Sequence, residues 1–311
     1  MTISAIVIAD SVSPEGKRLT TFQLRYPRFI HAEFLTHRMF SRNASSSRAI
    51  PVERMIADLR RDPAMPVYWG SHKPGMQAGE ELSQQDIETC REIWLDAMDD
   101  AIGHARLLID QGLHKQIANR ILEPWAHINV VCSGTEWANF FALRAHADAQ
   151  PEIKALAEAM MAALAQSDPE LLQAGDWHLP YINYDDHEVG LNHGNTVDGS
   201  WLEVMKKVSV ARCARVSYLT HDGRQTTVEE DIALYEKLVV SQPLHASPSE
   251  HQATPDTVSH YQKLLLVDAH LGGDEEELIS SDEDWDHPEE HGNFVGWRQL
   301  RKQLPNEFIP G

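Results

Sequence analysis

The sequence predicts an α+β fold, in which a small number of strands packs against several amphipathic helices. Residues 3–8 are apolar and β-branched, and residues 19–26 alternate apolar and polar side chains, as is typical of strands. A third β-rich run follows at 128–132. Helical spacing of apolar residues is clearest over 83–112 and 151–165. All 311 residues are expected to belong to a single domain.

Turn residues mark the ends of other predicted helices. Pro27 fits the first turn of a helix whose apolar face includes Phe34 and whose end carries His37. Pro51 opens a second, short helix, which Pro63 ends. Further helices are expected at 112–124, 135–144, 201–218, 227–238 and 293–304.

Composition is typical of a cytoplasmic protein. The formal net charge is −20 at pH 7, which argues against long nucleic acid as a partner, because phosphate binding requires a basic face. Three cysteines without a CxxC pair fit a reducing compartment. No apolar run approaches the roughly 20 residues that a membrane helix needs, so no membrane partner is expected. Residues 1–13 lack the basic start of a signal peptide.

Residues 272–290 are strongly acidic and poor in large apolar side chains, so we expect a solvated loop there. Several histidines follow Leu244 in the sequence. Their spacings do not place two ligands on one helical face, apart from His287 and His291 beside Pro288. No metal site is therefore predicted.

A basic stretch at residues 36–48 stands out in this acidic chain, with three arginines, a histidine and four serines. Guanidinium groups match phosphate oxygens geometrically, and serine hydroxyls add short donors, so the stretch indicates an anionic ligand. Serine-rich runs also compete with helix formation. We expect a helix end that opens into a phosphate-binding loop. A solvated basic turn is the alternative that composition alone leaves equally open.

The spacing within the basic stretch resembles the signature of the flavin-dependent thymidylate synthases. His37 and Arg38 are followed by seven residues and then by Ser46, any residue and Arg48. The family pattern reads Arg-His-Arg, seven residues, Ser, any residue, Arg. Thr36 stands where the family has its first arginine.

Three further segments resemble the same family. Arg120 with residues 139–153 matches one pattern, and residues 214–218 and 245–251 match two others. The last two normally precede the Arg-His-Arg signature, whereas here they follow it, so the chain resembles a circularly permuted member. Permutation is tolerated where the new ends fall on an exposed loop. The resemblance implies a central mixed or antiparallel sheet with packed helices.

The resemblance also implies ligands and an assembly. These are FAD as cofactor, dUMP as substrate, methylenetetrahydrofolate as carbon donor and NADPH as reductant, in a homotetramer. Five residues match family positions that hold the flavin: His37, Arg38, Asn139, Ser217 and His245.

The nucleotide would contact a second set of residues. Ser46, Arg48 and Arg120 match the positions that hold it, mostly through its phosphate. Arg144 matches the arginine that polarises the pyrimidine ring, and a guanidinium can stabilise negative charge that develops there during hydride transfer from flavin. Glu33 stands where the family has a glutamine near the base. Because an ionised carboxylate only accepts hydrogen bonds, dCMP is an alternative to dUMP.

Each of these positions also has a structural interpretation. His37 could sit at a helix end where the dipole favours it, and Glu33 could pair with Arg38 or Arg42. Cys132 could act as a nucleophile, although a small buried thiol is favoured. Two further functions stay open, namely an enzyme that leaves a hydroxymethyl group, and a nucleotide-binding protein without catalysis.

Overall fold

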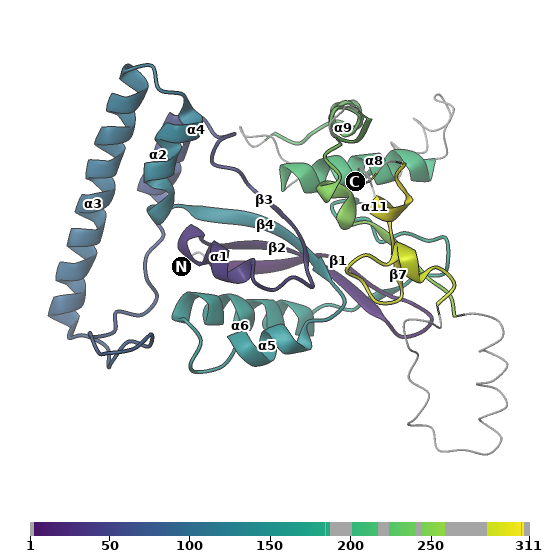
Figure 1. The fold of residues 1–311 in the computed structure, drawn as a ribbon, viewed down its shortest axis with the longest axis horizontal. Helices are drawn as coiled ribbons and strands as arrows, with labels where there is room; N and C mark the ends of the chain where they lie inside the picture. Colours follow the sequence, from purple (N-terminus) through teal and green to yellow (C-terminus); the bar gives the residue numbers. More distant parts are fainter. Residues whose placement is uncertain are drawn as a thin grey trace, which may run out of the picture.

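The computed structural model describes residues 3–183, 185–186, 201–216, 224–240, 244–258, 285–305 and 307. It has the predicted α+β architecture, with one central sheet and helices on both of its faces (Figure 1). Within the described part of the chain, no helix combines the length and the apolar character that crossing a membrane would require.

The central sheet has five strands in the order β3-β4-β2-β1-β5. The strands are β1 (Ser4–Val12), β2 (Arg18–Pro27), β3 (Ser41–Ala44), β4 (His127–Gly134) and β5 (Glu170–Leu171). All pairs are antiparallel except β1 with β5, which is parallel. The sheet is therefore mixed, as expected.

One face of the sheet carries the main hydrophobic core. Alternate residues of β2 point to this face, and Phe22, Leu24 and Tyr26 are fully buried there. The covering helices are α1 (His31–Phe34), α5 (Ala138–Arg144) and α6 (Pro151–Ala165). This packing fixes α1 and α5, which lie next to several of the predicted site residues.

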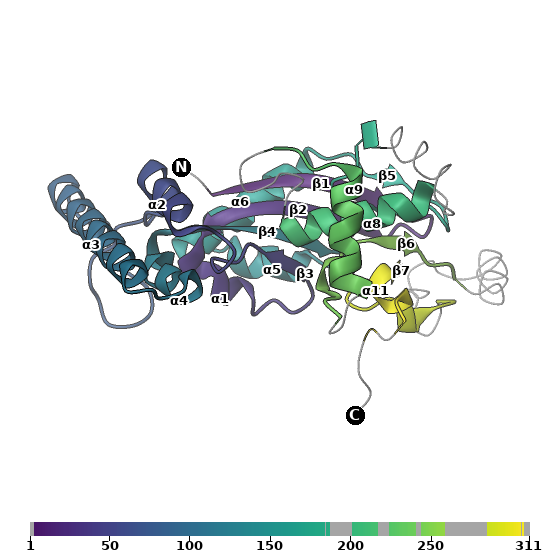
Figure 2. The same cartoon turned by 90° about the horizontal axis from the view of Figure 1, so that it is seen from above.

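The opposite face is more polar and only partly covered (Figure 2). Gln23, Arg25 and Asn129 occupy the intervening positions of β2 and β4, and therefore point to it. Two helices lie over one end of this face: α8 (Trp201–Arg215) and α9 (Val228–Tyr235). A capping box formed by Thr227 and Glu230 opens α9, at the start of the predicted helix 227–238.

A helical unit stands at the other end of the sheet. It consists of α2 (Val52–Arg61), α3 (Gln84–Asp110), α4 (Lys115–Ala118) and the 3-10 helix η2 (Asn119–Trp125). Its core joins Met55, Met98 and Ile102. The buried face of α3 consists of Ile87, Met98, Ile102 and Ala105, whereas Ile109, at the end of the same helix, is 37% exposed.

Several predicted elements are shorter or different. The helix expected to carry His37 ends at Phe34, after the 3-10 turn η1 (Arg28–Ile30). The predicted helix at 112–124 divides into α4 and η2, and the one at 135–144 begins only at Ala138. Part of the expected serine loop is strand β3, because its backbone pairs with β4 and this ladder outweighs local serine bonding.

The C-terminal part also differs from the expected basic helix. A second, two-stranded sheet joins β6 (Ala253–Pro255) to β7 (Trp297–Gln299). Only α11 (Leu300–Gln303) is helical in that range. The remaining short elements are the π-helix η3 (Glu236–Val240) and the 3-10 helices η4 (Ser247–Glu250) and η6 (Pro288–Glu290).

The predicted acidic loop lies partly outside the described residues, which resume at Trp285. That indole is 4% exposed, whereas Asp286, Pro288 and Glu289 are exposed, so the described end of the segment is anchored at Trp285 and otherwise open to solvent. Asp256, itself 1% exposed, accepts hydrogen bonds from the neighbouring His287 backbone and contacts the rings of His287 and His291. These two histidines therefore tie the segment to β6.

A row of buried polar contacts crosses the polar face of the sheet. The His178 ring bonds Ser11 Oγ at 2.9 Å and Thr21 Oγ1 at 2.8 Å. Thr21 continues to Ser133 Oγ at 2.6 Å, and that hydroxyl contacts His251 Nδ1 at 2.8 Å. Burial lowers the pKa of both imidazoles to about 3, so both rings are neutral at pH 7.

Candidate functional site

His37 and Arg144, predicted to serve flavin and substrate, are in direct contact. Nε of Arg144 donates a hydrogen bond to Nε2 of His37 at 2.9 Å. Burial, together with the guanidinium groups of Arg144 and Arg42, lowers the pKa of His37. The ring is therefore neutral at pH 7 and accepts the hydrogen bond without offsetting the arginine charge.

Aromatic packing and one further arginine hold His37 in place. Its ring meets that of Phe140 edge-on, with 4.8 Å between centroids. Arg42, on β3, places Nη1 within 3.0 Å of the Leu35 carbonyl oxygen and 2.8 Å of the His37 carbonyl oxygen. Arg42 thus satisfies backbone acceptors that the end of α1 leaves open. It is a positioning residue that the sequence suggested only through its place in the basic stretch.

The surface beside the pair formed by His37 and Arg144 is partly apolar. Arg38 and Asn139 are exposed. Met39 and Leu143, their close neighbours in sequence, are 51% and 54% exposed. Two exposed polar groups thus stand next to two exposed apolar ones.

The second half of the basic stretch is anchored by η2. The Ser47 hydroxyl donates to Oε1 of Glu123 at 2.6 Å, and Arg120 Nη1 donates to the same oxygen at 2.8 Å. Asn119 donates to the Ser47 carbonyl at 2.8 Å. Glu123 and Asn119 were not predicted as site residues, because their role depends on tertiary contacts. Arg48 is exposed.

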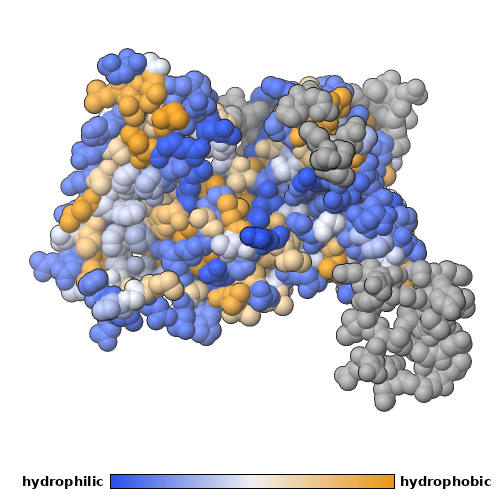
Figure 3. Space-filling view, in the orientation of Figure 1, coloured by the Kyte–Doolittle hydropathy of each residue, from blue (hydrophilic) through white to orange (hydrophobic). Residues whose placement is uncertain are grey.

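A cleft of about 800 Å³, here called the central cleft, opens on the polar face of the sheet. Its walls come from loop residues 44–47 and α2 on one side, and from Arg215, Val216 and Leu234 on the other. Figure 3 shows it as the hollow between the part of the molecule that carries α2 and the part that carries α9. Of the predicted site residues in the described part of the chain, only Ser46 lines it.

The lining of the central cleft is basic in an acidic protein. It includes five arginines and two aspartates, an excess of three positive charges: Arg25, Arg28, Arg54, Arg61, Arg215, Asp58 and Asp62. The chain as a whole has a net charge of −20. Such a local reversal of sign favours an anionic ligand and repels competing acidic surfaces.

Comparison with protein families gives a match over the first half of the chain. The sequence profile described as Thy1, thymidylate synthase complementing protein, matches residues 13–170. The chain belongs to the Thy1 family. The match spans about half of the chain and includes the basic stretch, Arg120, Asn139 and Arg144. Residues 214–218 and 245–251 lie beyond it, so the circular permutation stays a prediction.

Solved structures similar to this Thy1 chain include two crystal structures of a UMP/dUMP methylase, PolB from Streptomyces cacaoi. The one bound with 5-Br UMP is 21% identical, with a TM-score of 0.42 over 53% of this chain and 89% of that chain. The one bound with 5-Br dUMP is 18% identical, with a TM-score of 0.44 over 53% and 90%. A comparison with curated proteins finds no match.

Two departures from the Thy1 pattern have clear structural consequences. Thr36, in place of an arginine, donates its hydroxyl to the Glu33 carbonyl at 2.7 Å. The half-buried Glu33 carboxylate has no hydrogen bond or ion pair to any described residue, so the expected pairing with Arg38 or Arg42 is not formed. Because α1 ends at Phe34, Glu33 and His37 do not share one helical face, contrary to expectation.

Three further residues named in the sequence analysis are His245, Ser217 and Cys132. His245 is exposed, and its backbone N–H donates to the Leu238 carbonyl at 2.8 Å. Ser217 lies outside the described residues, next to Val216, whose φ of 61° is unusual for a β-branched side chain. Cys132 is fully buried, and burial raises the pKa of its thiol, so it lacks the thiolate that a nucleophile needs.

Proposed function

We propose that this protein is a flavin-dependent thymidylate synthase. It methylates dUMP to dTMP with methylenetetrahydrofolate as carbon donor and with FAD that NADPH reduces. Membership of the Thy1 family supports this proposal. The observation that carries it is the contact between Arg144 and His37, which presents a guanidinium that no carboxylate of the described residues pairs with.

The surroundings of Arg144 suit the role of stabilising negative charge on a substrate. Only Nε is used within the described part of the chain, so both Nη groups are available to a ligand. A cation bonded to a neutral imidazole keeps its charge for the ligand, in a half-buried position where electrostatic interactions are stronger than in water. Arg144 would bind a pyrimidine carbonyl and stabilise the negative charge that develops on the ring.

The residues near this pair fit a flavin. A flavin combines a flat, largely apolar ring with a pyrophosphate, and FAD would supply hydride once bound. The exposed apolar side chains of Met39 and Leu143 suit the ring, and the exposed Arg38 and Asn139 suit polar groups. Arg38 and Asn139 would hold the cofactor, with His37 fixing the arginine beside it.

A homotetramer would unite the two halves of the site. In one chain, Ser46 lines the central cleft, whereas His37 and Arg144 do not. Neighbouring copies could place the serine loop of one chain opposite the arginine of another. Light scattering of the purified protein tests this, and a stable, fully active monomer would contradict it.

The predicted circular permutation is compatible with the packing. The segments 214–218 and 245–251 would precede the basic stretch in an unpermuted chain. Here η4 lies beside β3, and α8 covers the sheet next to η4. Segments remote in sequence therefore lie side by side, which supports the proposed permutation.

A second candidate substrate is dCMP. Glu33, in place of the family glutamine, has a carboxylate without a partner among the residues that the structure describes. Such a group would accept a hydrogen bond from the amino group of cytosine.

The absorption spectrum of the purified protein and a titration with FAD test the proposed function. We expect a flavin band, or saturable FAD binding at micromolar concentration. Failure to bind FAD would contradict the proposal and favour a nucleotide-binding protein without this chemistry.

A further inference from the structure

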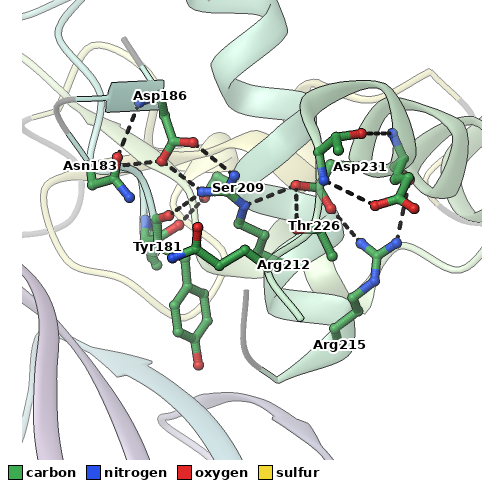
Figure 4. A network of polar contacts seen from close by, with 12 residues as sticks. Tyr181, Asn183, Asp186, Ser209, Arg212, Arg215, Thr226 and Asp231 are labelled. Atoms are coloured by element: carbon green, nitrogen blue, oxygen red, sulfur yellow. Dashed lines mark hydrogen bonds and ion pairs between the residues drawn. The ribbon is translucent and has the colours of Figure 1, made fainter. Parts of the chain in front are cut away.

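Two arginines one turn apart on α8, Arg212 and Arg215, share a carboxylate but face different surroundings (Figure 4). The shared carboxylate is Asp231, which is fully buried. The Arg212 side chain is 5% exposed and the Arg215 side chain is 23% exposed. The contrast separates a structural arginine from one that is open to a ligand.

Arg212 uses every nitrogen of its guanidinium within the protein. Nη1 and Nη2 donate to the two oxygens of Asp186 at 2.7 and 2.8 Å. Nε donates to Asp231 at 2.9 Å, and Nη1 also reaches the Tyr181 carbonyl at 2.8 Å. This bidentate, buried arrangement ties α8 to the 181–186 loop and leaves little for a ligand.

Arg215 is bound on one side only. Nη1 donates to Oδ1 of Asp231, and Nη2 lies 3.4 Å from the Glu230 carbonyl. Nε, and one N–H on each Nη group, have no partner among the described residues. The other oxygen of Asp231 is taken by Arg212 and by the Thr226 hydroxyl at 2.9 Å. The charge of Arg215 is therefore only partly offset.

Arg215 also has a place in the central cleft. It lines the wall opposite α2, across from the loop that carries Ser45, Ser46 and Ser47. Arg28 lines the same cleft and lies 3.4 Å from the Ser45 carbonyl through Nη1. Nη2 of Arg28 also lies 3.2 Å from Oε1 of Glu123, the oxygen that accepts from the Ser47 hydroxyl. Arg215 and the hydroxyls of Ser45 and Ser46 are therefore the donors that remain around this hollow, and such a set suits phosphate oxygens.

We propose that Arg215 is an anion-binding residue of the central cleft, which takes a phosphate group of the nucleotide or of the flavin. Asp231 is the positioning residue that holds its guanidinium. The inference rests on the proposed function only for the identity of the ligand. For the nucleotide and for the flavin alike, guanidinium N–H groups would donate hydrogen bonds to a phosphate oxygen.

Calorimetric titrations of the full-length chain test this role and distinguish the two phosphate sources. The ligands are dUMP against deoxyuridine, and FAD against riboflavin, because each pair differs in its phosphate. Arg215→Gln should weaken binding of at least one phosphate-bearing ligand by about tenfold or more, since a charge-assisted hydrogen bond is lost. Binding of the phosphate-free counterpart should not change.

Two further variants complete the design. Arg215→Lys keeps a positive charge but not the planar fork, so it should lose affinity by a smaller factor. Arg224→Gln removes an equal charge from an arginine that pairs with Glu230 and does not line the cleft, so it should bind like the wild type. Thermal unfolding checks that each variant is folded, and Arg215→Lys serves if the glutamine variant is not.

The outcomes separate the two proposals. Wild-type protein that binds neither dUMP nor FAD would contradict the proposed function. If both Arg215 variants bind dUMP and FAD as tightly as the wild type does, the proposed role of Arg215 would be overturned and the proposed function would stand. Equal weakening for a ligand and its phosphate-free counterpart would also overturn it, because the loss would then be structural.

Discussion

The two faces of the central sheet hold their cations in different ways. On the face covered by α5 and α6, Arg144 donates to the neutral ring of His37 and keeps its charge. On the other face, arginines of the central cleft pair with carboxylates, as Arg215 does with Asp231, and an excess of positive charge remains. A cation beside an imidazole suits stabilisation of a transition state, whereas a partly offset cluster suits binding of a charged group.

The largest expected effect comes from replacing Arg212, the buried arginine that shares Asp231 with Arg215. Arg212→Met should lower the free energy of unfolding by about 3–5 kcal/mol, because it leaves Asp186 and Asp231 buried without their main partner. Urea unfolding measures it. Arg224→Met, which breaks an exposed pair with Glu230, should lower the free energy of unfolding far less, because solvent screens that pair. If both variants lose the same free energy of unfolding, the buried ion-pair network of Arg212 contributes no more to stability than the exposed pair of Arg224.

Next in size is the effect of removing the cation on the other face. Arg144→Ala should reduce kcat/KM by about 10²–10³-fold, by analogy with loss of an oxyanion donor. Cys132→Ala should stay within about tenfold of the wild type, since only packing of a buried thiol changes. Steady-state kinetics with dUMP compares them. A larger loss for the cysteine variant would point to a covalent mechanism.

The buried imidazoles of the polar face make stability depend on pH. Burial lowers the pKa of His178 and His251 from 6.5 to about 3, whereas the unfolded chain keeps the ordinary value. Between these values the unfolded state binds more protons, so the free energy of unfolding falls as pH is lowered. Each ring should contribute about 1.4 kcal/mol per pH unit.

Urea titrations at a series of pH values measure that slope. His178→Gln removes one titrating ring and can keep hydrogen bonds to Ser11 and Thr21, so its slope between pH 6.5 and about 3 should be shallower. Identical slopes for the variant and the wild type would show that the folded imidazole is not held neutral.

The smallest expected effect concerns the base. If Glu33 meets the pyrimidine as an ionised carboxylate, Glu33→Gln should shift the ratio of kcat/KM for dUMP over dCMP by about fivefold towards dUMP, since one hydrogen bond is worth about 1 kcal/mol. Parallel assays with both nucleotides measure it. An unchanged ratio would place Glu33 away from the base.

Long, periodic elements could be predicted from the sequence, because their signal is local. The strands β1 and β2 and the helices α3 and α6 follow directly from apolar spacing. Short elements could not be predicted. Strand β3 forms because a remote strand pairs with it, and α1 ends before His37 because Arg42 can satisfy its last carbonyl groups.

The candidate site also contains residues that could be predicted from the sequence and residues that could not. Resemblance selected both His37 and Arg144, and the fold brings these residues together although 107 positions separate them. It did not assign a role to Arg42, Glu123 or Arg215. Their roles depend on which backbone or side chain lies opposite, and no periodicity or spacing in the chain encodes that information.

The central claim is that this protein methylates dUMP by flavin and folate chemistry. Mass spectrometry of the nucleotide formed from dUMP, with methylenetetrahydrofolate, FAD and NADPH present, tests it most directly. We expect dTMP, whose formation requires both FAD and Arg144. A hydroxymethylated nucleotide, a product from dCMP alone, or turnover that does not depend on flavin would contradict it.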